Sequence, residues 1–369
     1  MLPFEPERLP PEDLNYIALM PSAGAANRSI STLNGLLYAL PNHSLLISPL
    51  TTQEAVLSSK IEGTQANLQD VLKFDAGESP PDQSQEADIH EIINYRQALR
   101  ASKDLLKEKP FCINTLLYLH KVLMSSVRGA DKTPGNLRSL QNGIGTPNST
   151  IAEAAFVPPS PLHLQDHMNK WEAYWHAETP DLLIQLALAH AQFEAIHPFM
   201  DGNGRIGRMI IPLFLYENKL LSEPCFYLSA YLEKNKEEYI QRLRNLGKPN
   251  SWTEWCIFFL EGVRQQAEAN TSTAKAVHDL YEKLKTQLLD LTHSQYAVPI
   301  LDHMFENPVF SASSIYKRPN MPTPPTISNM LKTMKDRRIL ATVREGAGRR
   351  PQVLALTDLI NLCEGQQII

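Results

Sequence analysis

One segment, from His197 to Arg208, restricts the fold more than any other part of the chain. Before it, an apolar pattern carried by residues 182–193 predicts an amphipathic helix that reaches Ile196. Pro198 disfavours helical backbone in the residue before it, so we expect this helix to stop at His197. Gly202 and Gly204 permit the positive φ angles of a tight loop, and a second helix is expected directly afterwards. The segment therefore predicts two helices joined by a short, sharply folded loop.

The same loop carries the chemical groups of an anion site. Backbone N–H groups at the start of a helix converge on one point, where the helix dipole also favours negative charge. Arg205 and Arg208 are three residues apart, so they share a helix face and can reach phosphate oxygens. Bare phosphates would repel Asp201, and a bridging Mg²⁺ removes that conflict. His197 adds a base whose ordinary pKa is about 6.5.

Three other interpretations of these residues stay open on spacing alone. The glycines of residues 202–207 have the spacing of a dinucleotide-binding fingerprint, but that motif follows a strand, whereas a helix is expected here. His190, Glu194 and His197 could hold zinc from one helix face, although a helical histidine is more often a hydrogen-bonded core residue. The loop could also be a simple helix–helix turn with surface arginines.

A family resemblance separates these interpretations. The letters HPFMDGNGRIGR at 197–208 resemble the Fic motif, HPFx[DE]GNGRxxR, at every defined position. Residues 135–138 and 141–145 resemble the stretch upstream of that motif, and residues 156–159 resemble the end of the family's flap hairpin. The resemblance spans residues 50–260 and implies a mainly α fold, in which a Fic helical core carries a small β-hairpin flap.

The resemblance implies a protein adenylyltransferase (AMPylator) that moves AMP from ATP to Ser, Thr or Tyr hydroxyls of target proteins, itself included. In that role His197 is the general base and Asp201 the Mg²⁺ ligand. The residues assigned to the nucleotide are Glu62, Gly202, Asn203, Gly204, Arg205, Gly207, Arg208 and Tyr239, the last as an adenine-stacking ring. The flap residues that would add a strand to the target are Glu153, Ala154, Ala155 and Phe156.

A second, shorter motif predicts inhibition. Residues 58–63, SSKIEG, resemble the family's inhibitory pattern [ST]xxxE[GN], with Ser58, Glu62 and Gly63 at its defined positions. Ser58 and Glu62 are four residues apart and share a helix face. The resemblance implies that Glu62 pairs with Arg208, occupies the cation meant for the γ-phosphate and leaves ATP in an unproductive pose.

The sequence around these motifs predicts four regions. They are an N-terminal helical region (1–105), the Fic core (106–265), a connecting helix (266–294) and a C-terminal winged helix (295–369). We expect an extended Pro-rich arm over the first twenty-odd residues, a short helix at 31–40, and a helix capped by Thr52 that runs from Gln53 past Glu62. The remaining expected helices cover 89–106, 113–127, 162–176, 180–196, 234–246, 252–291 with a break, 296–305, 311–316 and 324–336. Residues 128–161 are expected to be loop with a small hairpin, and 339–343 and 352–356 to be strands.

The C-terminal region is basic within a chain of net charge −5. Residues 317–350 carry nine Lys or Arg and two acids. Asn329, Lys332 and Lys335 could line the third helix of a winged helix, with Arg349 and Arg350 on its wing. This surface could bind DNA through phosphate contacts or dock a protein, and the sequence leaves both open.

Composition narrows the functional class. No run approaches the ~18 apolar residues of a membrane span, and the start lacks a secretory pattern. The four cysteines are scattered, which predicts neither a zinc site nor disulfides and fits a cytoplasmic protein without membrane partners. A homodimer is compatible with the sequence. Alternative functions are a DNA-binding regulator that senses ATP, or a Fic enzyme that removes AMP or transfers UMP, phosphocholine or phosphate.

Overall fold

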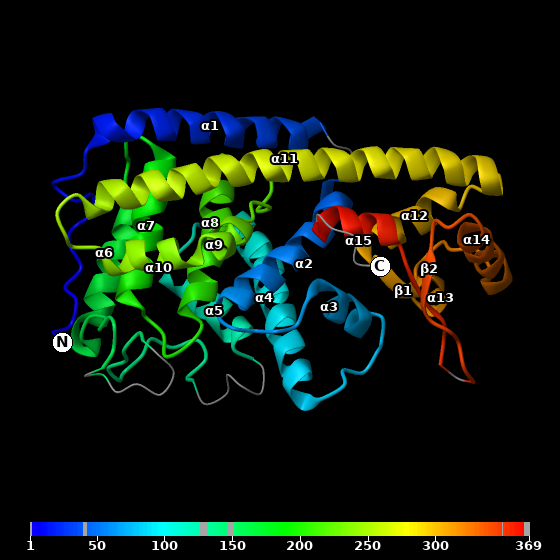
Figure 1. The fold of residues 1–369 in the computed structure, drawn as a ribbon, viewed down its shortest axis with the longest axis horizontal. Coiled ribbons are helices and arrows are strands. Elements are labelled where there is room, and N and C mark those ends of the chain that lie inside the picture. Colours follow the sequence, from blue (N-terminus) through cyan, green and yellow to red (C-terminus); the bar gives the residue numbers. More distant parts are fainter. Residues whose placement is uncertain are drawn as a thin grey trace.

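The computed structural model of the protein describes residues 2–39, 43–125, 132–145, 151, 153–348 and 350–364. The structure is mainly helical, as predicted, and has one small antiparallel sheet (Figure 1). Its helices are α1 (Tyr16–Ala39), α2 (His43–Ile61), α3 (Leu68–Asp75), α4 (Gln83–Glu108), α5 (Ile113–Leu123), the short 3-10 helix η2 (Pro161–His163), α6 (Leu164–Trp175), α7 (Leu182–Ile196), α8 (Asn203–Glu217), α9 (Ser229–Lys234), α10 (Lys236–Arg244), α11 (Ser251–Thr292), α12 (Ala297–Glu306), α13 (Ala312–Tyr316), α14 (Pro324–Asp336) and α15 (Thr357–Glu364). The strands are β1 (Val309–Ser311), β2 (Ala341–Arg344) and β3 (Val353–Ala355).

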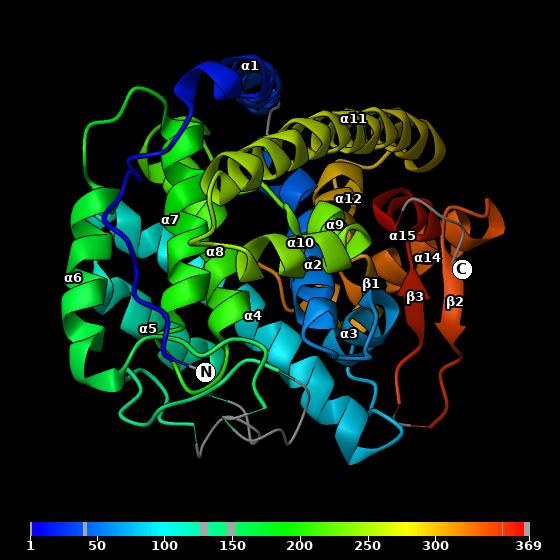
Figure 2. The same cartoon turned by 60° about the vertical axis from the view of Figure 1, so that its left-hand side comes forward.

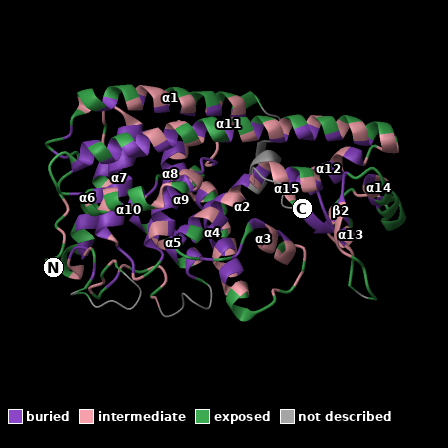
Figure 3. Cartoon of the chain, viewed as in Figure 1, coloured by how far each residue is buried: buried purple, intermediate pink, exposed green. Residues whose placement is uncertain are grey.

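Two helices at the centre position the predicted site. Every residue of α7 from Leu183 to Ile196 is buried, so the predicted amphipathic pattern is wrong: α7 is surrounded by other helices on all sides. Asp181 caps its start by accepting hydrogen bonds from the N–H groups of Leu183 (2.9 Å) and Ile184 (3.0 Å). Helix α8 is also mostly buried and packs against α7. Figure 3 shows the buried residues gathered around these helices.

The N-terminal region differs from the prediction. An extended arm is present only up to residue 15, because α1 begins at Tyr16 and passes through Pro21. The buried residues of α1, such as Ala23, Ala26 and Ile30, recur every three or four positions. Helix α1 contacts α11 and lies along it (Figures 1 and 2). This apolar contact outweighs the backbone hydrogen bond that a proline within a helix removes.

Helix α2 is also longer than predicted at its start, and it ends before Glu62 and not beyond it. Thr52 does not cap it but lies buried inside it, and the helix stops at Ile61. Glu62 lies in the turn that follows, where its N–H donates to the carbonyl of Ser59 (3.0 Å). Gly63 continues this turn with φ of 105°, a conformation that glycine adopts without strain.

The C-terminal part follows the predicted order with two additions. Neither strand β1, which precedes the helix expected at 311–316, nor helix α15 was predicted. The sheet order is β1-β3-β2, with Val309 and Ala341 both paired to Ala355. Helices α12 and α15 contact α2, so this part lies against the helix that precedes Glu62. The predicted break in α11 is absent: one helix of 42 residues runs from the core to the C-terminal part.

No helix in the described part of the chain is both long and apolar enough to cross a membrane.

Candidate active site

The loop between α7 and α8 is held in shape by its own backbone and by Asn203. His197 ends α7 in a left-handed conformation (φ 51°), and Gly202 begins α8 with φ of 78°. The Asn203 side chain binds Phe199 twice: Oδ1 accepts from its N–H and Nδ2 donates to its carbonyl, both at 2.8 Å. Because a helix and not a strand leads into the loop, the dinucleotide-binding interpretation is wrong.

Two residues outside the motif support this loop: Arg138, which ends the upstream stretch 135–138 but was given no role, and His120, which was not predicted. Arg138 donates hydrogen bonds to the carbonyls of His197 (Nε, 2.9 Å), Pro159 (NH2, 2.6 Å) and Leu140 (NH1, 3.3 Å). The ring of His120 stacks on Phe199, with ring centroids 3.8 Å apart. Neither contact could be found from spacing, because both partners lie far away in sequence.

His120 joins two loops through a fixed tautomer. Its Nδ1 accepts from the N–H of Gly135 (2.9 Å), so the proton is on Nε2, which donates to the carbonyl of Asp201 (3.1 Å). Burial lowers the pKa of His120 to about 4, and hydrogen bonding to Asp201 opposes that shift only in part. His120 is therefore neutral at physiological pH and acts as a structural bridge.

The imidazole of His197 has the state that a general base requires. Its Nδ1 faces the carbonyl of Glu194 at 3.4 Å. Since a carbonyl can only accept, Nδ1 carries the proton and the lone pair of Nε2 is left to take another. Burial lowers the pKa of His197 to about 4, so the ring is neutral at physiological pH.

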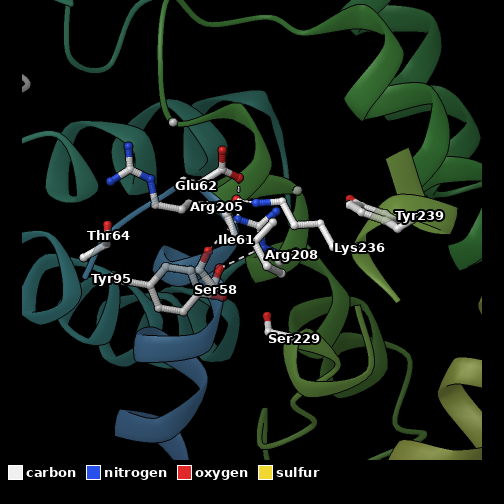
Figure 4. A network of polar contacts seen from close by, with 12 residues as sticks. Ser58, Ile61, Glu62, Thr64, Tyr95, Arg205, Arg208, Ser229, Lys236 and Tyr239 are labelled. Atoms are coloured by element: carbon white, nitrogen blue, oxygen red, sulfur yellow. Dashed lines mark hydrogen bonds and ion pairs between the residues drawn. The ribbon is translucent and has the colours of Figure 1, made fainter. Parts of the chain in front are cut away.

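Arg208 is fully enclosed and is bound by the end of α2 (Figure 4). Its NH2 forms an ion pair with Glu62 Oε1 at 2.6 Å, and its Nε donates to Ser58 Oγ at 2.9 Å. NH2 also donates to the Ser58 carbonyl at 2.8 Å. A Cβ atom on Gly204 would overlap with Glu62 Oε1, so a side chain there would require this carboxylate to shift. The predicted pair between Glu62 and Arg208 is thus present.

The charge of Arg208 stabilises the ionised form of the Glu62 carboxyl. Burial raises the pKa of the Glu62 carboxyl, but the charge of Arg208 and its hydrogen bond outweigh burial and lower that pKa overall. Two further contacts hold the end of α2: Lys236 Nζ donates to the Ile61 carbonyl at 2.5 Å, and Lys60 pairs with Glu233 at 2.9 Å. Glu62 is therefore ionised and fixed in front of Arg208.

Arg205 has two acidic neighbours, one of which was not predicted. It lies 3.1 Å from Glu91 on α4 and 3.4 Å from Asp201. The Asp201 side chain is 47% exposed, and its Oδ1 accepts from the N–H of Gly202 at 2.5 Å. Mg²⁺ is commonly bound by one or two carboxylates together with substrate phosphates and water, and an exposed carboxylate beside an anion nest fits that pattern.

The zinc interpretation is not supported. Both ring nitrogens of His190 are already engaged, Nδ1 with the Gly207 carbonyl (2.8 Å) and Nε2 with the Tyr239 hydroxyl (3.1 Å). Burial lowers the pKa of His190 to about 3, as for a neutral core histidine. Among the residues that the structure describes, no cluster of three or more His, Cys, Asp or Glu could hold a metal.

Part of the predicted set, namely Glu62, Phe156, His197, Gly204, Arg208 and Tyr239, lines one cavity of about 240 Å³, whereas Asp201, Gly202, Asn203, Arg205 and Gly207 do not line it. His197, Arg208, Glu62 and Tyr239 line it together with apolar side chains from α2, α10 and the flap. Ligand pockets usually measure about 300–1,000 Å³, so the cavity with Glu62 in place is small for a nucleoside triphosphate. Tyr239 forms part of the wall and is only 3% exposed.

The flap is smaller than the predicted hairpin in the part that is described. Ile144 and Phe156 form one antiparallel bridge, with N–H to carbonyl distances of 2.8 and 3.0 Å. Residues 146–150 and 152, which belong to the loop and small hairpin expected at 128–161, lie outside the described residues. Phe156 lines the cavity and Ala154 is buried, whereas Glu153 and Ala155 are exposed.

Comparison with known proteins agrees with this geometry. Residues 20–104 match the family model described as Fic/DOC family N-terminal, and residues 110–215 match the model described as Fic/DOC family. The chain belongs to the Fic/DOC family.

Two curated relatives are named as protein adenylyltransferases. A probable protein adenylyltransferase of Aquifex aeolicus is 26% identical over 201 residues, which cover 53% of this chain and 54% of that protein. The protein adenylyltransferase Fic of Nematostella vectensis is 26% identical over 131 residues, which cover 34% of this chain and 28% of that protein. The matches thus span about half and about a quarter of those relatives.

Solved structures show the same fold. A Fic family protein from Desulfovibrio desulfuricans superposes with a TM-score of 0.57 at 20% identity, covering 91% of this chain and 96% of that one. Fic-1 from C. elegans gives a TM-score of 0.54 at 20% identity, covering 70% and 73% of the two chains.

Proposed function

We propose that the protein is an autoinhibited protein adenylyltransferase, which transfers AMP from ATP to a hydroxyl side chain of a target protein. The observation that carries this proposal is the cavity that His197 and Gly204, at the start of α8, line together with the ion pair of Glu62 and Arg208. The names of the curated relatives support a transferase of this class at the level of the family.

The residues take distinct parts in the reaction. The target hydroxyl oxygen attacks the α-phosphorus of ATP, the bond to pyrophosphate breaks, and Nε2 of His197 takes the hydroxyl proton. Backbone N–H groups at the start of α8 bind the α-phosphate, while Arg205 and Arg208 stabilise the charge that develops on pyrophosphate. Asp201 would hold Mg²⁺, whose charge neutralises the phosphates. Tyr239 forms the wall against which adenine lies, and the flap edge at Ala155 receives the target as an added strand.

The position of Glu62 supports the proposed inhibition. Arg208 cannot bind a γ-phosphate while its guanidinium is paired with Glu62 and Ser58. A carboxylate at this place also repels the triphosphate. Productive binding of ATP therefore requires the end of α2 to move away from Arg208.

The proposed AMP transfer is tested with ATP that carries a label at either its α- or its γ-phosphate. The Glu62→Gly variant is incubated with Mg²⁺ and ATP labelled at either the α- or the γ-phosphate, alone and with cell lysate. We expect protein labelling only from the α-position, and a mass increase of one AMP on the purified protein if it modifies itself. Label from the γ-position would instead indicate phosphate transfer, and loss of AMP from a labelled target would indicate the hydrolytic reaction.

A second proposal concerns the C-terminal part. We propose that α12 to β3 form a winged helix that binds DNA through α14. The side chains of Asn329 and Lys332 on α14 are exposed, while Lys335 is half-buried. Arg350 is exposed at the predicted wing, and Arg349 lies outside the described residues. Retention of the full chain on DNA should fall steeply with salt, and Lys332→Glu should weaken it for all sequences alike. Salt-independent retention would favour a protein-docking surface.

A further inference from the structure

Arg138 is a buried arginine that no described carboxylate neutralises. It is 2% exposed, and its guanidinium is surrounded by backbone carbonyls. Besides the bonds to His197, Leu140 and Pro159, its NH2 lies 3.4 Å from the Ile196 carbonyl. Burying a charge in such surroundings costs free energy, because neutral carbonyls compensate a buried charge less well than a carboxylate does. The presence of Arg138 here therefore suggests that its hydrogen bonds have a function.

The carbonyls that Arg138 binds belong to two parts of the site. Those of Ile196 and His197 are at the end of α7, where helix carbonyls lack partners within the helix and the dipole favours a cation. That of Pro159 follows the flap strand. The backbone N–H of Arg138 also donates to the carbonyl of Pro198 at 2.9 Å. One residue therefore fixes both sides of His197 in the chain and connects them to the flap.

His197 needs this support because its backbone is left-handed. A φ of 51° is uncommon for a residue with a side chain and costs about 1–3 kcal/mol unless the surroundings fix it. A rotation of this peptide would swing the imidazole ring away from the start of α8, since the direction of the ring follows from the backbone of residue 197. Arg138 Nε holds the carbonyl of that same residue at 2.9 Å.

We propose that Arg138 is a positioning residue for AMP transfer, which fixes the backbone of His197 and couples it to the flap. The coupling rests on the proposed function, because it presumes that His197 acts as base and that the flap receives the target. A target strand that docks on the flap edge pulls on the chain leading to Pro159. Through the shared guanidinium this movement reaches His197, so target engagement and base alignment occur together.

The pKa of His197 depends on the charge of Arg138 and would not change if Arg138 acted through packing alone. Burial is the main cause of the lowered pKa of His197, and the positive charge of Arg138 lowers it further. Glu62 and Asp201 act in the opposite direction, and the Glu194 carbonyl also favours the charged ring through its hydrogen bond. Removal of the Arg138 charge should therefore raise the pKa of His197 from about 4 toward its ordinary value.

Two substitutions separate charge from geometry. Arg138→Met removes the charge and the hydrogen bonds, whereas Arg138→Lys keeps the charge but cannot span the same carbonyls. Gln185→Met is the matched control, since Gln185 is buried and its Nε2 also ties together backbone carbonyls, those of Tyr174 (2.7 Å) and Ala177 (2.9 Å). All three are made in the full chain with Glu62→Gly, and their thermal unfolding is compared.

The measurements are NMR titration of the His197 ring, binding of a fluorescent ATP analogue and transfer of α-labelled AMP. We expect Arg138→Met to raise the pKa of His197, and both Arg138 variants to lower transfer by roughly a hundredfold with nucleotide affinity retained. Arg138→Lys should titrate as the parent does, and Gln185→Met should transfer as the parent does.

Equal His197 titration in Arg138→Met and its parent would overturn the proposal. Transfer by the Arg138 variants that falls only in proportion to their unfolding, or a loss of the same size in Gln185→Met, would also overturn it. If the parent itself transfers no AMP, the proposed function fails. The titration difference between the Met and Lys variants then still shows whether the charge of Arg138 acts on the His197 ring, as the contact between the two residues requires.

Discussion

Replacing Glu62 by glycine should release Arg208 and increase AMP transfer by about 10- to 30-fold. A charge-assisted hydrogen bond contributes about 1.5–3 kcal/mol. Because the Glu62 side chain is 40% exposed, water screens part of this interaction and we take the lower part of that range, about 1.5–2 kcal/mol. Each 1.4 kcal/mol corresponds to a tenfold change in the population of enzyme with Arg208 free, which gives about 10- to 30-fold.

The assay follows α-labelled ATP into protein at a nucleotide concentration below saturation. ATP affinity should rise more than AMP affinity, because only the triphosphate reaches Arg208. Glu261→Gln is the control, since Glu261 pairs with Arg264 at the same 2.6 Å distance and is likewise 40% exposed, but lies outside the cavity. Equal transfer by Glu62→Gly and wild type would refute the reasoning, and so would an increase of the same size in Glu261→Gln.

Four further tests, three substitutions and one pH profile, concern the site. His197→Ala should lower transfer by roughly 10²–10⁴-fold while ATP still binds, as measured by label transfer and nucleotide titration. Since the base must be neutral and its pKa is about 4, transfer should stay constant from pH 8 to 5 and fall only as the pH approaches 4; a fall centred near 6.5 would contradict this. Burial raises the pKa of Glu194 to about 7, so its folded form keeps a proton that the unfolded chain loses above about 4.5, and stability falls as pH rises between these values. Glu194→Gln should therefore unfold at a higher temperature than wild type at pH 8 but not at pH 4, and a pH-independent difference would argue against a buried, protonated carboxyl. A side chain on Gly207 would overlap with Glu194 Oε1, so Gly207→Ala should cost about 1–3 kcal/mol in a denaturant titration, and an unchanged midpoint would disprove the close contact.

The site was predictable where its residues are contiguous. The loop from His197 to Arg208 carries its own geometry: Pro198 stops one helix and Gly202 allows the next to begin. Glu62 was located by the family's inhibitory pattern, but the other distant partners of the loop were not predictable from local chemistry. Arg138, His120 and Glu91 become meaningful only when the fold brings them within hydrogen-bond distance.

The errors in the fold have a similar origin. A proline-rich start looked extended, yet α1 passes through Pro21 because its apolar face packs on α11. Thr52 looked like a cap, yet it lies within α2. The buried helix α7 cannot show an amphipathic pattern, because it has no exposed face. In each case packing against other helices outweighed a local preference.

The length of helix α11 fixes the rotation of the C-terminal part about the helix axis relative to the core. Its 42 residues extend for ~63 Å and lead from the core to α12, which lies on α2. Each residue inserted into such a helix turns everything beyond it by about 100° and shifts it by about 1.5 Å. Insertions or deletions in α11 therefore keep α12 facing α2 only when they approach whole numbers of turns. Only changes in length that are close to whole helical turns are therefore expected to be tolerated, even where the side chains of α11 face solvent.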